Sequence, residues 1–444
     1  MASRRPGQAL GVGLAATAVT VVGLMMLAER GTADHWGAFV VGLAVVAISF
    51  PILRRSAVRH DERALVTFFV VALLLRIGGA IVRSYVDLGV YGGGDSSVYH
   101  QSGLLLAERF QAGNFDTGLP SLTGTHFIRF FTGLVYTFIG PSPLGAFIVY
   151  AWLGFWGSFF FYRAFTIAVP EGRARSYARL VFLLPSFLFW PSSIGKEAWM
   201  MMSLGLAALG AARFLSGRPG RGLLVAALGL WLAAIVRPHI AGAMGMGLVT
   251  AVAIRRPSKP RGYLTPIAKG AALLSVAVMA FLLMGQTERF LADRGIETSS
   301  GITAVLEQTS ERGAYGGSYV APSIATSPRQ APVAIATVLY RPFIVEAHNN
   351  QSLLSALETG FLLFLSVVRL RWALTAARML RRRPYLALCA AHTALMIVIL
   401  SSAANFGLLA RQRVQLLPFF LALLCIPPPS DDTPTAEAAV VAAR

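Results

Sequence analysis

Long apolar runs recur from one end of this chain to the other, and they limit the folds that it can adopt. Lipid offers no water to exposed backbone groups, so a spanning segment must satisfy them within a helix or a closed barrel. A barrel would need alternating apolar and polar residues, which these runs lack. The runs therefore predict transmembrane helices. The composition agrees, since 13% of the residues are charged, against about 25% in a soluble domain.

Twelve runs are long enough to be interpreted as spans, so we predict an all-α polytopic membrane protein. The spans cover about residues 9–28, 36–53, 64–83, 143–166, 179–194, 197–214, 222–236, 240–254, 270–285, 352–369, 386–402 and 414–427. The first run resembles a signal peptide, but further spans follow it, so we interpret it as an uncleaved helix. Cys389 and Cys425 lie in apolar runs and are expected to be small core residues.

The net charge of +19 is distributed as membrane topology requires. With the N-terminus in the cytoplasm, basic residues gather in the cytoplasmic loops, as the positive-inside rule predicts. These loops hold Arg54, Arg55, Arg59 and Arg63; Arg173, Arg175 and Arg179; Arg218 and Arg221; Arg255, Arg256, Lys259, Arg261 and Lys269; and Arg371, Arg378, Arg381, Arg382 and Arg383. We therefore expect a lipid bilayer and no nucleic acid as partner, in the bacterial plasma membrane. Both termini would be cytoplasmic, with 428–444 a disordered tail.

Two long loops are expected on the outer side, at about 84–142 and 286–351. Within the first, residues 97–111 and 126–140 are predicted to be helices that lie on the membrane surface. The segment 126–140 could instead cross the bilayer, but every later basic loop would then face outward. An outer loop as long as 286–351 is usually functional or disordered.

The first outer loop carries the strongest candidate for chemistry. Residues Gly92–His100 form a glycine-rich polar stretch that contains Asp95, Tyr99 and His100. Acids are scarce in this chain, with 20 Asp and Glu against 39 Lys and Arg. A positioned carboxylate can serve as a general base toward a hydroxyl group. The competing explanation for Asp95 is that it caps the helix at 97–111.

Charged residues also mark the outer ends of several predicted spans. Lys196 and Glu197 follow a span that contains Pro185 and Pro191, and Arg237-Pro238-His239 joins two apolar runs. Charged groups beside spans are costly and tend to be functional. The alternative for Lys196 and Glu197 is an incidental ion pair in a capped turn. The alternative for Arg237 is contact with lipid phosphates.

A third group of outer residues runs from Asn405 to Arg413. Arg411 and Arg413 oppose the positive-inside rule, and a guanidinium held outside can bind phosphate through two hydrogen bonds. A simple outer-leaflet anchor would explain them equally. Arg341 and His348 in the second outer loop are candidate members of the same group. Together the outer residues suggest transfer of a group from a lipid-linked phosphate to an alcohol.

At this point the chain resembles the GT-C superfamily of membrane glycosyltransferases, which use polyprenyl-phosphate-linked sugars. The similarity rests on Leu73–Arg76 followed by Gly94–His100, the two surface helices, Pro185-Ser186 to Lys196-Glu197, and Arg411–Pro418. It covers about 64–427, with 1–63 as a two-helix addition. It implies that Asp95 is the catalytic base. Glu197, the second acid expected on the outer face, is a further candidate catalytic residue.

The resemblance also implies the ligands. The donor would be a polyprenyl-phosphate sugar. The candidate substrate-binding residues are Lys196, Arg237, His239, Arg341, His348, Asn405, Arg411 and Arg413, with Tyr99 and His100 as contacts to the acceptor or the phosphate. The acceptor would be a hydroxyl-bearing glycan, lipid or protein. The first loop lacks an Asp-Xaa-Asp or Glu-Asp pair, so we expect neither metal nor cofactor, as in the aminoarabinose and O-mannosyl transferases.

Three other functional classes stay open. An O-antigen-type polymerase or ligase would also have many helices, a large outer loop and outer arginines, but it would use a diphosphate-linked glycan. A transporter or flippase would place charges near the bilayer midplane and often shows repeats. A purely structural membrane protein is the third possibility.

Overall fold

The computed structural model describes residue 29 and residues 31–58, 63–255, 264–292, 295, 301–313, 319–325 and 327–428. The predicted span 9–28 and nearly all of the tail 428–444 lie outside these residues. The described chain forms helices, with one isolated backbone bridge between Tyr319 and Asn405. These residues thus belong to the all-α class that the sequence predicts.

The chain divides into two compact units. Unit 1 consists of the described residues up to Pro120, with Ile128–Trp152 and Ser192–Gly195, and unit 2 of Ser121–Phe127, Leu153–Pro191 and the described residues from Lys196 onward. Helices α5 and α6 contribute residues to both. The first elements are α2 (Ala33–Val58), α3 (Arg63–Ser84), the π-helix η1 (Tyr85–Val90), α4 (Asp95–Gln111), α5 (Gly124–Ile139) and α6 (Pro143–Ala168).

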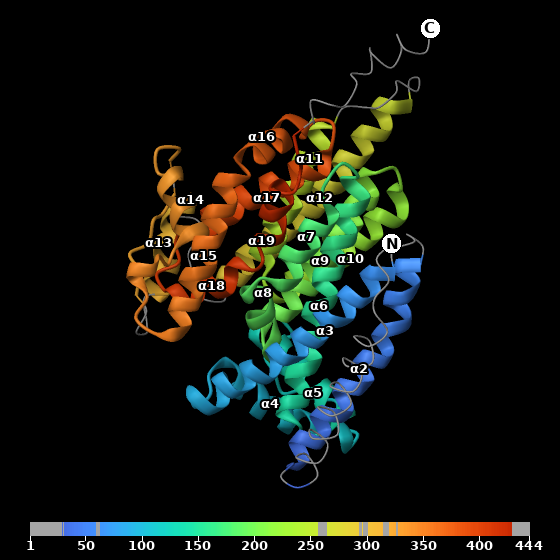
Figure 1. Cartoon of the computed structure of the whole chain (residues 1–444), viewed down its shortest axis with the longest axis vertical. Coiled ribbons are helices and arrows are strands. Elements are labelled where there is room, and N and C mark those ends of the chain that lie inside the picture. The colour runs from blue at the N-terminus through green and yellow to red at the C-terminus, as the bar shows by residue number, and fades with distance from the viewer. Residues whose placement is uncertain are drawn as a thin grey trace, which may run out of the picture. The chain divides into compact units, whose positions relative to one another are not determined.

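The remaining elements belong mainly to unit 2. They are α7 (Ala174–Leu183), α8 (Pro185–Phe189), η2 (Trp190–Ser192), α9 (Lys196–Leu215), α10 (Pro219–Val236), α11 (Pro238–Ile254), α12 (Leu264–Ala292), α13 (Gly301–Gly313), α14 (Ala331–Tyr340), η3 (Ile344–Glu346), α15 (Asn350–Val368), α16 (Leu370–Met379), α17 (Pro384–Leu400), α18 (Phe406–Arg413) and α19 (Leu417–Leu423) (Figure 1). Helices α9 and α10 run side by side, and α11 packs against α12 and α17.

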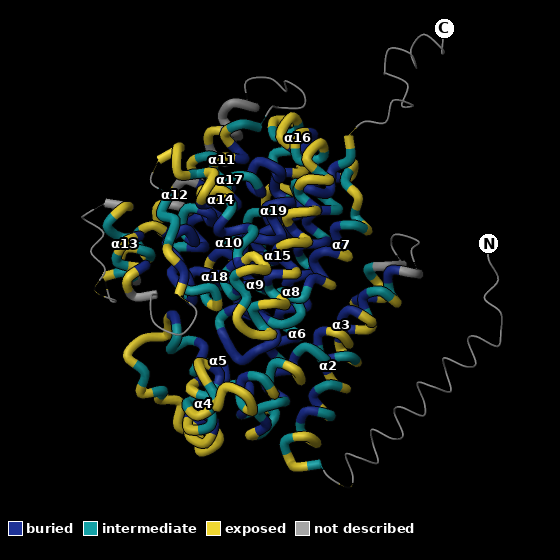
Figure 2. Tube along the Cα trace, turned by 60° about the vertical axis from the view of Figure 1, so that its left-hand side comes forward, coloured by how far each residue is buried: buried dark blue, intermediate teal, exposed yellow. Residues whose placement is uncertain are grey.

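Among the described residues, six helices are long and apolar enough to cross a membrane, or up to seven if the bent pair α16 and α17 counts as one span. The six candidate spans are Ala33–Ser56, Leu65–Val90, Pro143–Ala168, Lys196–Leu215, Pro219–Val236 and Asn350–Val368. Exposed apolar side chains such as Phe364 and Val367 on α15 suit a surface that faces lipid. In Figure 2 the buried residues concentrate in the middle of unit 2, while α13 and α16 carry exposed stretches.

Several predicted boundaries correspond to helices of the structure. The predicted helices at 97–111 and 126–140 form as α4 and α5, while their position on a membrane surface stays a prediction. The predicted span 179–194 is interrupted, because Leu184 adopts an extended conformation before Pro185 and so separates α7 from α8. A residue before proline is disfavoured in the helical region, which explains this break.

Unit 1 is stabilised by polar contacts between segments far apart in the sequence. The Asp34 carboxylate at the start of α2 accepts hydrogen bonds from Ser142 Oγ at 2.6 Å and from the Leu144 backbone N–H at 3.0 Å. Trp152 Nε1 donates to Ser49 Oγ at 2.8 Å. Helix α4 packs closely on α5, since a Cβ at Gly103 would approach the Thr132 side chain to 2.7 Å.

In unit 2, glycines allow the closest approach of helices. A Cβ at Gly210 of α9 would lie 2.1 Å from the backbone N of Ala226 in α10, and one at Gly229 would lie 2.3 Å from Ala207 N. Small residues at such positions let two helix backbones pack directly, which is the main way in which helices associate in a membrane. The α9–α10 pair is therefore built around contacts that a larger residue cannot make.

The variant Gly210→Val should lower the stability of the protein by about 1–3 kcal/mol, because overpacking forces the two backbones apart. Thermal unfolding of the detergent-solubilised protein, followed by tryptophan fluorescence, measures this. The matched control is Gly360→Val in α15, where a Cβ would meet no heavy atom within 4 Å. Equal destabilisation by the two variants would contradict the proposed role of the α9–α10 contact.

Candidate functional site

An acid–arginine cluster, consisting of Glu197, Arg237 and Arg411, lies in unit 2. Arg237 Nη2 donates a hydrogen bond to Glu197 Oε1 at 2.8 Å, and Arg411 Nε lies 3.1 Å from the same oxygen. The Glu197 and Arg237 side chains are each 6% exposed, whereas that of Arg411 is 26% exposed. The neighbouring Lys196 donates from Nζ to Thr125 Oγ1 at 2.8 Å. Two cations, Arg237 and Arg411, thus contact one carboxylate, and Lys196 is the residue next to Glu197 in the sequence.

Local sequence explains how these side chains are presented. Glu197 stands in the first turn of α9, where the positive end of the helix dipole favours an acid. Arg237 occupies the junction of α10 and α11, and it has non-helical backbone angles because Pro238 follows it. Arg411 stands in the last turn of α18, where the negative end of the dipole favours a cation.

One nitrogen of the cluster lacks a protein partner. Arg237 Nη1 is buried and has no hydrogen bond to any residue that the structure describes. Buried donors are almost always satisfied, so a ligand that reaches this nitrogen would supply its acceptor. Arg237 and Arg411 carry two positive charges beside one carboxylate. This arrangement can bind an anion such as a phosphate group.

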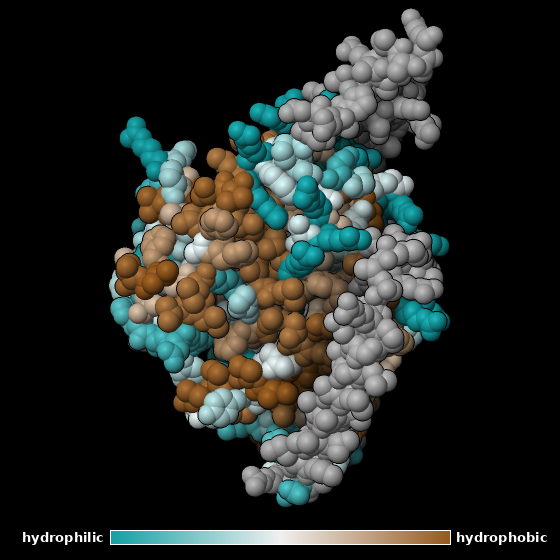
Figure 3. All heavy atoms as spheres, viewed as in Figure 1, coloured by the Kyte–Doolittle hydropathy of each residue, from teal (hydrophilic) through white to brown (hydrophobic). Residues whose placement is uncertain are grey.

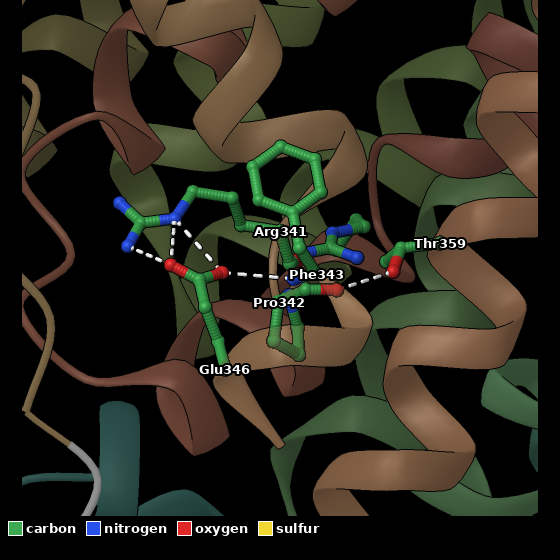
Figure 4. A network of polar contacts seen from close by, with 6 residues as sticks. Arg341, Pro342, Phe343, Glu346 and Thr359 are labelled. Carbon is green, nitrogen blue, oxygen red and sulfur yellow. Dashed lines mark hydrogen bonds and ion pairs between the residues drawn. The ribbon is translucent and has the colours of Figure 1, made fainter.

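A second network surrounds Arg341 (Figure 4). Arg341 Nε donates to Glu346 Oε1 at 2.9 Å and Oε2 at 3.2 Å, and the Phe343 backbone N–H donates to Glu346 Oε2 at 2.8 Å. Thr359 Oγ1 donates to the Pro342 carbonyl at 2.7 Å, which attaches this loop to α15. The Arg341 guanidinium thus has an acid of its own.

Helix α18 connects the two groups of charges. Its Arg411 reaches Glu197, while its Arg413 donates through Nη2 to the Arg341 carbonyl oxygen. Burial lowers the pKa of Arg413 to about 10, and the nearby Glu358 carboxylate acts in the opposite direction. Arg413 therefore stays a cation at neutral pH. Two arginines of this short helix thus contact residues of the sequence-based group, Arg411 at Glu197 and Arg413 at Arg341.

Asn405 has a structural role in this region. Its Oδ1 accepts hydrogen bonds from the backbone N–H groups of Gly407 at 2.8 Å and Leu408 at 3.1 Å, so it is the N-cap of α18. The preceding residue, Ala404, accepts through its carbonyl a hydrogen bond from Val320 N at 3.0 Å. Part of the predicted second outer loop therefore runs alongside the start of α18.

The two candidate histidines of unit 2 lie at helix starts. His239 is the second residue of α11 and is partly buried, two positions after Arg237. His348 is exposed and donates from its backbone N to Ser352 Oγ at 3.0 Å, beside the Asn349 cap of α15. His348 is close enough to Glu346 for its charge to affect that carboxyl group. His348 therefore belongs to the surroundings of the Arg341 network.

Asp95, Tyr99 and His100 belong to α4 in unit 1. Asp95 is exposed and is the first residue of the helix, after the N-cap Gly94. The side chain that bonds to the cap residue is that of Ser97, whose Oγ accepts from Gly94 N at 3.2 Å and donates to Gly94 O at 2.9 Å. The N-cap position is therefore not occupied by Asp95.

Tyr99 and His100 contribute to the packing of α4. Tyr99 is buried, and His100 Nδ1 lies 2.6 Å from Tyr136 Oη on α5. Burial lowers the pKa of His100 below its usual value, although the charge of Asp34 acts the other way. His100 therefore favours the neutral imidazole at neutral pH, in which one ring nitrogen can accept a hydrogen bond.

The sequence analysis missed two buried acids. Asp87 lies in the π-helix η1, where it pairs with Arg83 Nη2 at 2.9 Å and accepts a hydrogen bond from Ser193 Oγ at 2.8 Å. Glu358 is buried in α15 and accepts from the Ser186 backbone N–H at 2.7 Å. An acid within a predicted span, such as Glu358 in 352–369, is itself a signal of function that could have identified it.

Comparisons with protein-family models, curated proteins and solved structures find no match to this chain. Among the described residues, no group of three or more His, Cys, Asp or Glu side chains is arranged to hold a metal ion.

The first prediction for this site concerns the buried carboxylate. Glu197→Ala should destabilise the protein by about 3–5 kcal/mol, because it leaves Arg237 buried without its counter-ion. The control Glu171→Ala breaks the ion pair between Glu171 and Arg383, in which the two side chains are 45% and 35% exposed, respectively. It should lower the stability by at most about 1 kcal/mol. Comparable losses in thermal unfolding for both variants would contradict the importance of burial.

The second prediction concerns pH. Partial burial raises the pKa of Glu346, but hydrogen bonds from Arg341 and Phe343 outweigh it and hold the pKa below the ordinary 4.5. The contribution of this carboxylate to folding is therefore present above pH 4.5 and is lost as the pH falls through the lower folded-state pKa. Melting temperatures of the native protein and Glu346→Gln should differ at pH 7 and converge below pH 4.5. A constant difference would be inconsistent with this pairing.

Proposed function

We propose that this protein is an integral membrane glycosyltransferase of the GT-C type, with about twelve spans. It would transfer a sugar from a polyprenyl-phosphate donor to a hydroxyl group of a glycan, lipid or protein. The reaction would take place at the outer face of the bacterial plasma membrane, at the outer ends of α9, α10 and α18. No metal or other cofactor is assigned to it.

The observation that carries the proposal is the excess of positive charge around Glu197. Arg237 and Arg411 contribute two positive charges against one carboxylate, and Lys196 precedes Glu197 in the sequence. A sugar phosphodiester carries about one negative charge, and the polyprenyl phosphate that leaves carries about two. A site in which cations gather around a single carboxylate therefore stabilises the leaving group more than the donor, which is the requirement for catalysis.

The proposed reaction uses Asp95 as the general base. The Asp95 carboxylate accepts the proton of the acceptor hydroxyl as its oxygen forms a bond to the anomeric carbon. The bond between that carbon and the phosphate oxygen breaks, and its electron pair leaves with the polyprenyl phosphate. Asp95 suits this role because it is exposed and is not the N-cap residue of α4.

Glu197 receives a different role from the one that the sequence suggested. Its Oε1 is already engaged by Arg237 and Arg411, so it holds the two guanidinium groups in place. We therefore assign proton transfer to Asp95 and positioning of the arginines to Glu197. Glu197→Gln should weaken donor binding while leaving the acidic limb of the pH–rate profile, which reports Asp95, unchanged.

A polymerase or ligase that uses a diphosphate-linked glycan is the second candidate. It would require more uncompensated positive charge, and α18 does bring Arg413 and Arg341 near the cluster. However, Arg341 is paired with Glu346, and Arg413 lies near Glu358. These acids favour the monophosphate donor. Direct comparison of mono- and diphosphate-linked sugars as substrates distinguishes the two functions.

The central prediction of this proposal concerns Asp95. Asp95→Asn should lower the rate of sugar transfer by about 10²–10⁴-fold, because the amide cannot accept the proton. Transfer of a radiolabelled sugar from polyprenyl phosphate to an acceptor extract measures this. The matched control Asp116→Asn alters another exposed acid of the same loop and should be nearly neutral. Full activity of Asp95→Asn would remove Asp95 from the catalytic role.

A further prediction concerns donor binding. Arg411→Ala should weaken the apparent affinity for the lipid-linked donor by about tenfold or more, since it removes a charge-assisted contact to phosphate. Arg411→Lys should retain part of the affinity, and the exposed Arg329→Ala should have no effect. If donor affinity is unchanged in Arg411→Ala, the residue is an anchor and not a ligand.

A further inference from the structure

A cavity of about 570 Å³ lies in unit 2 where α9 and α11 end and α17 begins. Arg255, Arg382 and Arg383 line it, together with Ala168 and Leu215 from the ends of α6 and α9. Its volume is within the roughly 300–1,000 Å³ of ligand-binding pockets. The cavity therefore combines a basic rim with an apolar part, in a size suited to a small ligand group.

Positively charged side chains gather at the rim. Of its three arginines, Arg383 is paired with Glu171, with Nε to Oε1 at 3.1 Å. The N-terminus of α17 also opens here, at Pro384, without a side-chain cap, and its dipole adds to the positive potential. Guanidinium groups bind phosphate oxygens through paired hydrogen bonds.

Helix α16 indicates that this rim lies at the level of lipid headgroups. The chain axis turns by 117° between α16 and α17, so α16 lies across the direction of the following helix. It exposes both Leu370 and Leu374 beside Arg371 and Arg378, as a helix in the membrane interface does. In Figure 3, hydrophilic side chains gather where Figure 1 shows α16, next to a hydrophobic area.

Aromatic contacts support the same placement. The Trp372 ring of α16 lies under the guanidinium groups of Arg369 at 4.7 Å and Arg173 at 5.0 Å. Tryptophan and arginine are typical of the membrane–water boundary. The cavity at the end of α16 is thus expected to open where the phosphates of one leaflet lie.

This cavity is distinct from the acid–arginine cluster. Helix α9 begins at Lys196, beside the cluster, and ends at Leu215, in the cavity wall. At 1.5 Å per residue its 20 residues separate the two places by roughly 30 Å. Helix α11 repeats this relation, since it starts after Arg237 and ends before Arg255. The two sites therefore lie at opposite ends of the same helices.

We propose that this cavity binds the phosphate-bearing headgroup of an anionic membrane phospholipid, in the leaflet opposite to the acid–arginine cluster. Arg255 and Arg382 hold the phosphate, the Arg383–Glu171 pair borders it, and the apolar residues contact the start of the acyl chains. Basic pockets between helices at a membrane surface recognise such headgroups through this combination of charge and apolar contact.

The experiment is native mass spectrometry of the full chain, titrated in detergent with phosphatidylglycerol or phosphatidylcholine. The double variant Arg255→Gln/Arg382→Gln should lose about tenfold in affinity for phosphatidylglycerol. The matched control Arg371→Gln/Arg378→Gln removes two charges from α16 outside the cavity lining and should retain native affinity. A second variant, Ser216→Phe, keeps every arginine but narrows the cavity, and should show the same loss as the double variant.

Several outcomes would overturn the proposal. They are equal binding of the two lipids, equal loss in both double variants, and undiminished binding by Ser216→Phe. If soluble glycerol 3-phosphate binds as tightly as the lipid, the site recognises free phosphate compounds and not the membrane. If the double variant does not fold, the lipid affinity of Ser216→Phe still tests the proposal, since this variant leaves all charges in place.

Discussion

The buried ion pair between Glu197 and Arg237 is the interaction on which the arrangement of unit 2 depends. A carboxylate with 6% exposure cannot be stabilised by water, so a cation must reach it at contact distance. That cation comes from the junction of α10 and α11, and Arg411 arrives from α18. Three segments far apart in the sequence therefore meet at the start of α9. The need of the buried Glu197 carboxylate for a counter-ion therefore stabilises this arrangement of helices and also brings the charged residues of the candidate site together.

Helix α18 links the Glu197–Arg237 ion pair to the second network, around Arg341. It is a short helix, capped by Asn405, with both arginines in its last turn. Arg411 contacts the Glu197 carboxylate. Arg413 donates a hydrogen bond to the Arg341 carbonyl and lies near Glu358. Arg411 thus shares Glu197 with Arg237, whereas Arg341 and Arg413 each have a further acid, Glu346 or Glu358, nearby. Under the proposed function, this distribution of charge suits a donor with one phosphate.

Properties that depend on local sequence could be predicted, whereas those that depend on distant contacts could not. Apolar runs predicted the all-helical class, and residues 97–111 and 126–140 do form α4 and α5. The grouping of Lys196, Glu197, Arg237 and Arg411 followed from their shared position at helix ends. The pairing of Arg341 with Glu346 and of Asp87 with Arg83 was missed. The sequence does not show which cation the fold brings within contact distance of a given carboxylate. Six or seven helices of the described part of the chain meet the criteria for spanning a membrane, so the twelve spans stay a prediction.

The most direct test of the account is an experimental structure of the protein in a lipid nanodisc with polyprenyl phosphate bound. We predict phosphate density at about 3 Å from the guanidinium groups of Arg237 and Arg411, where Arg237 Nη1 has no protein partner among the described residues. The Asp95 carboxylate should face the position that the sugar would occupy. A phosphate bound elsewhere, with the acid–arginine cluster unchanged and remote from it, would contradict the account.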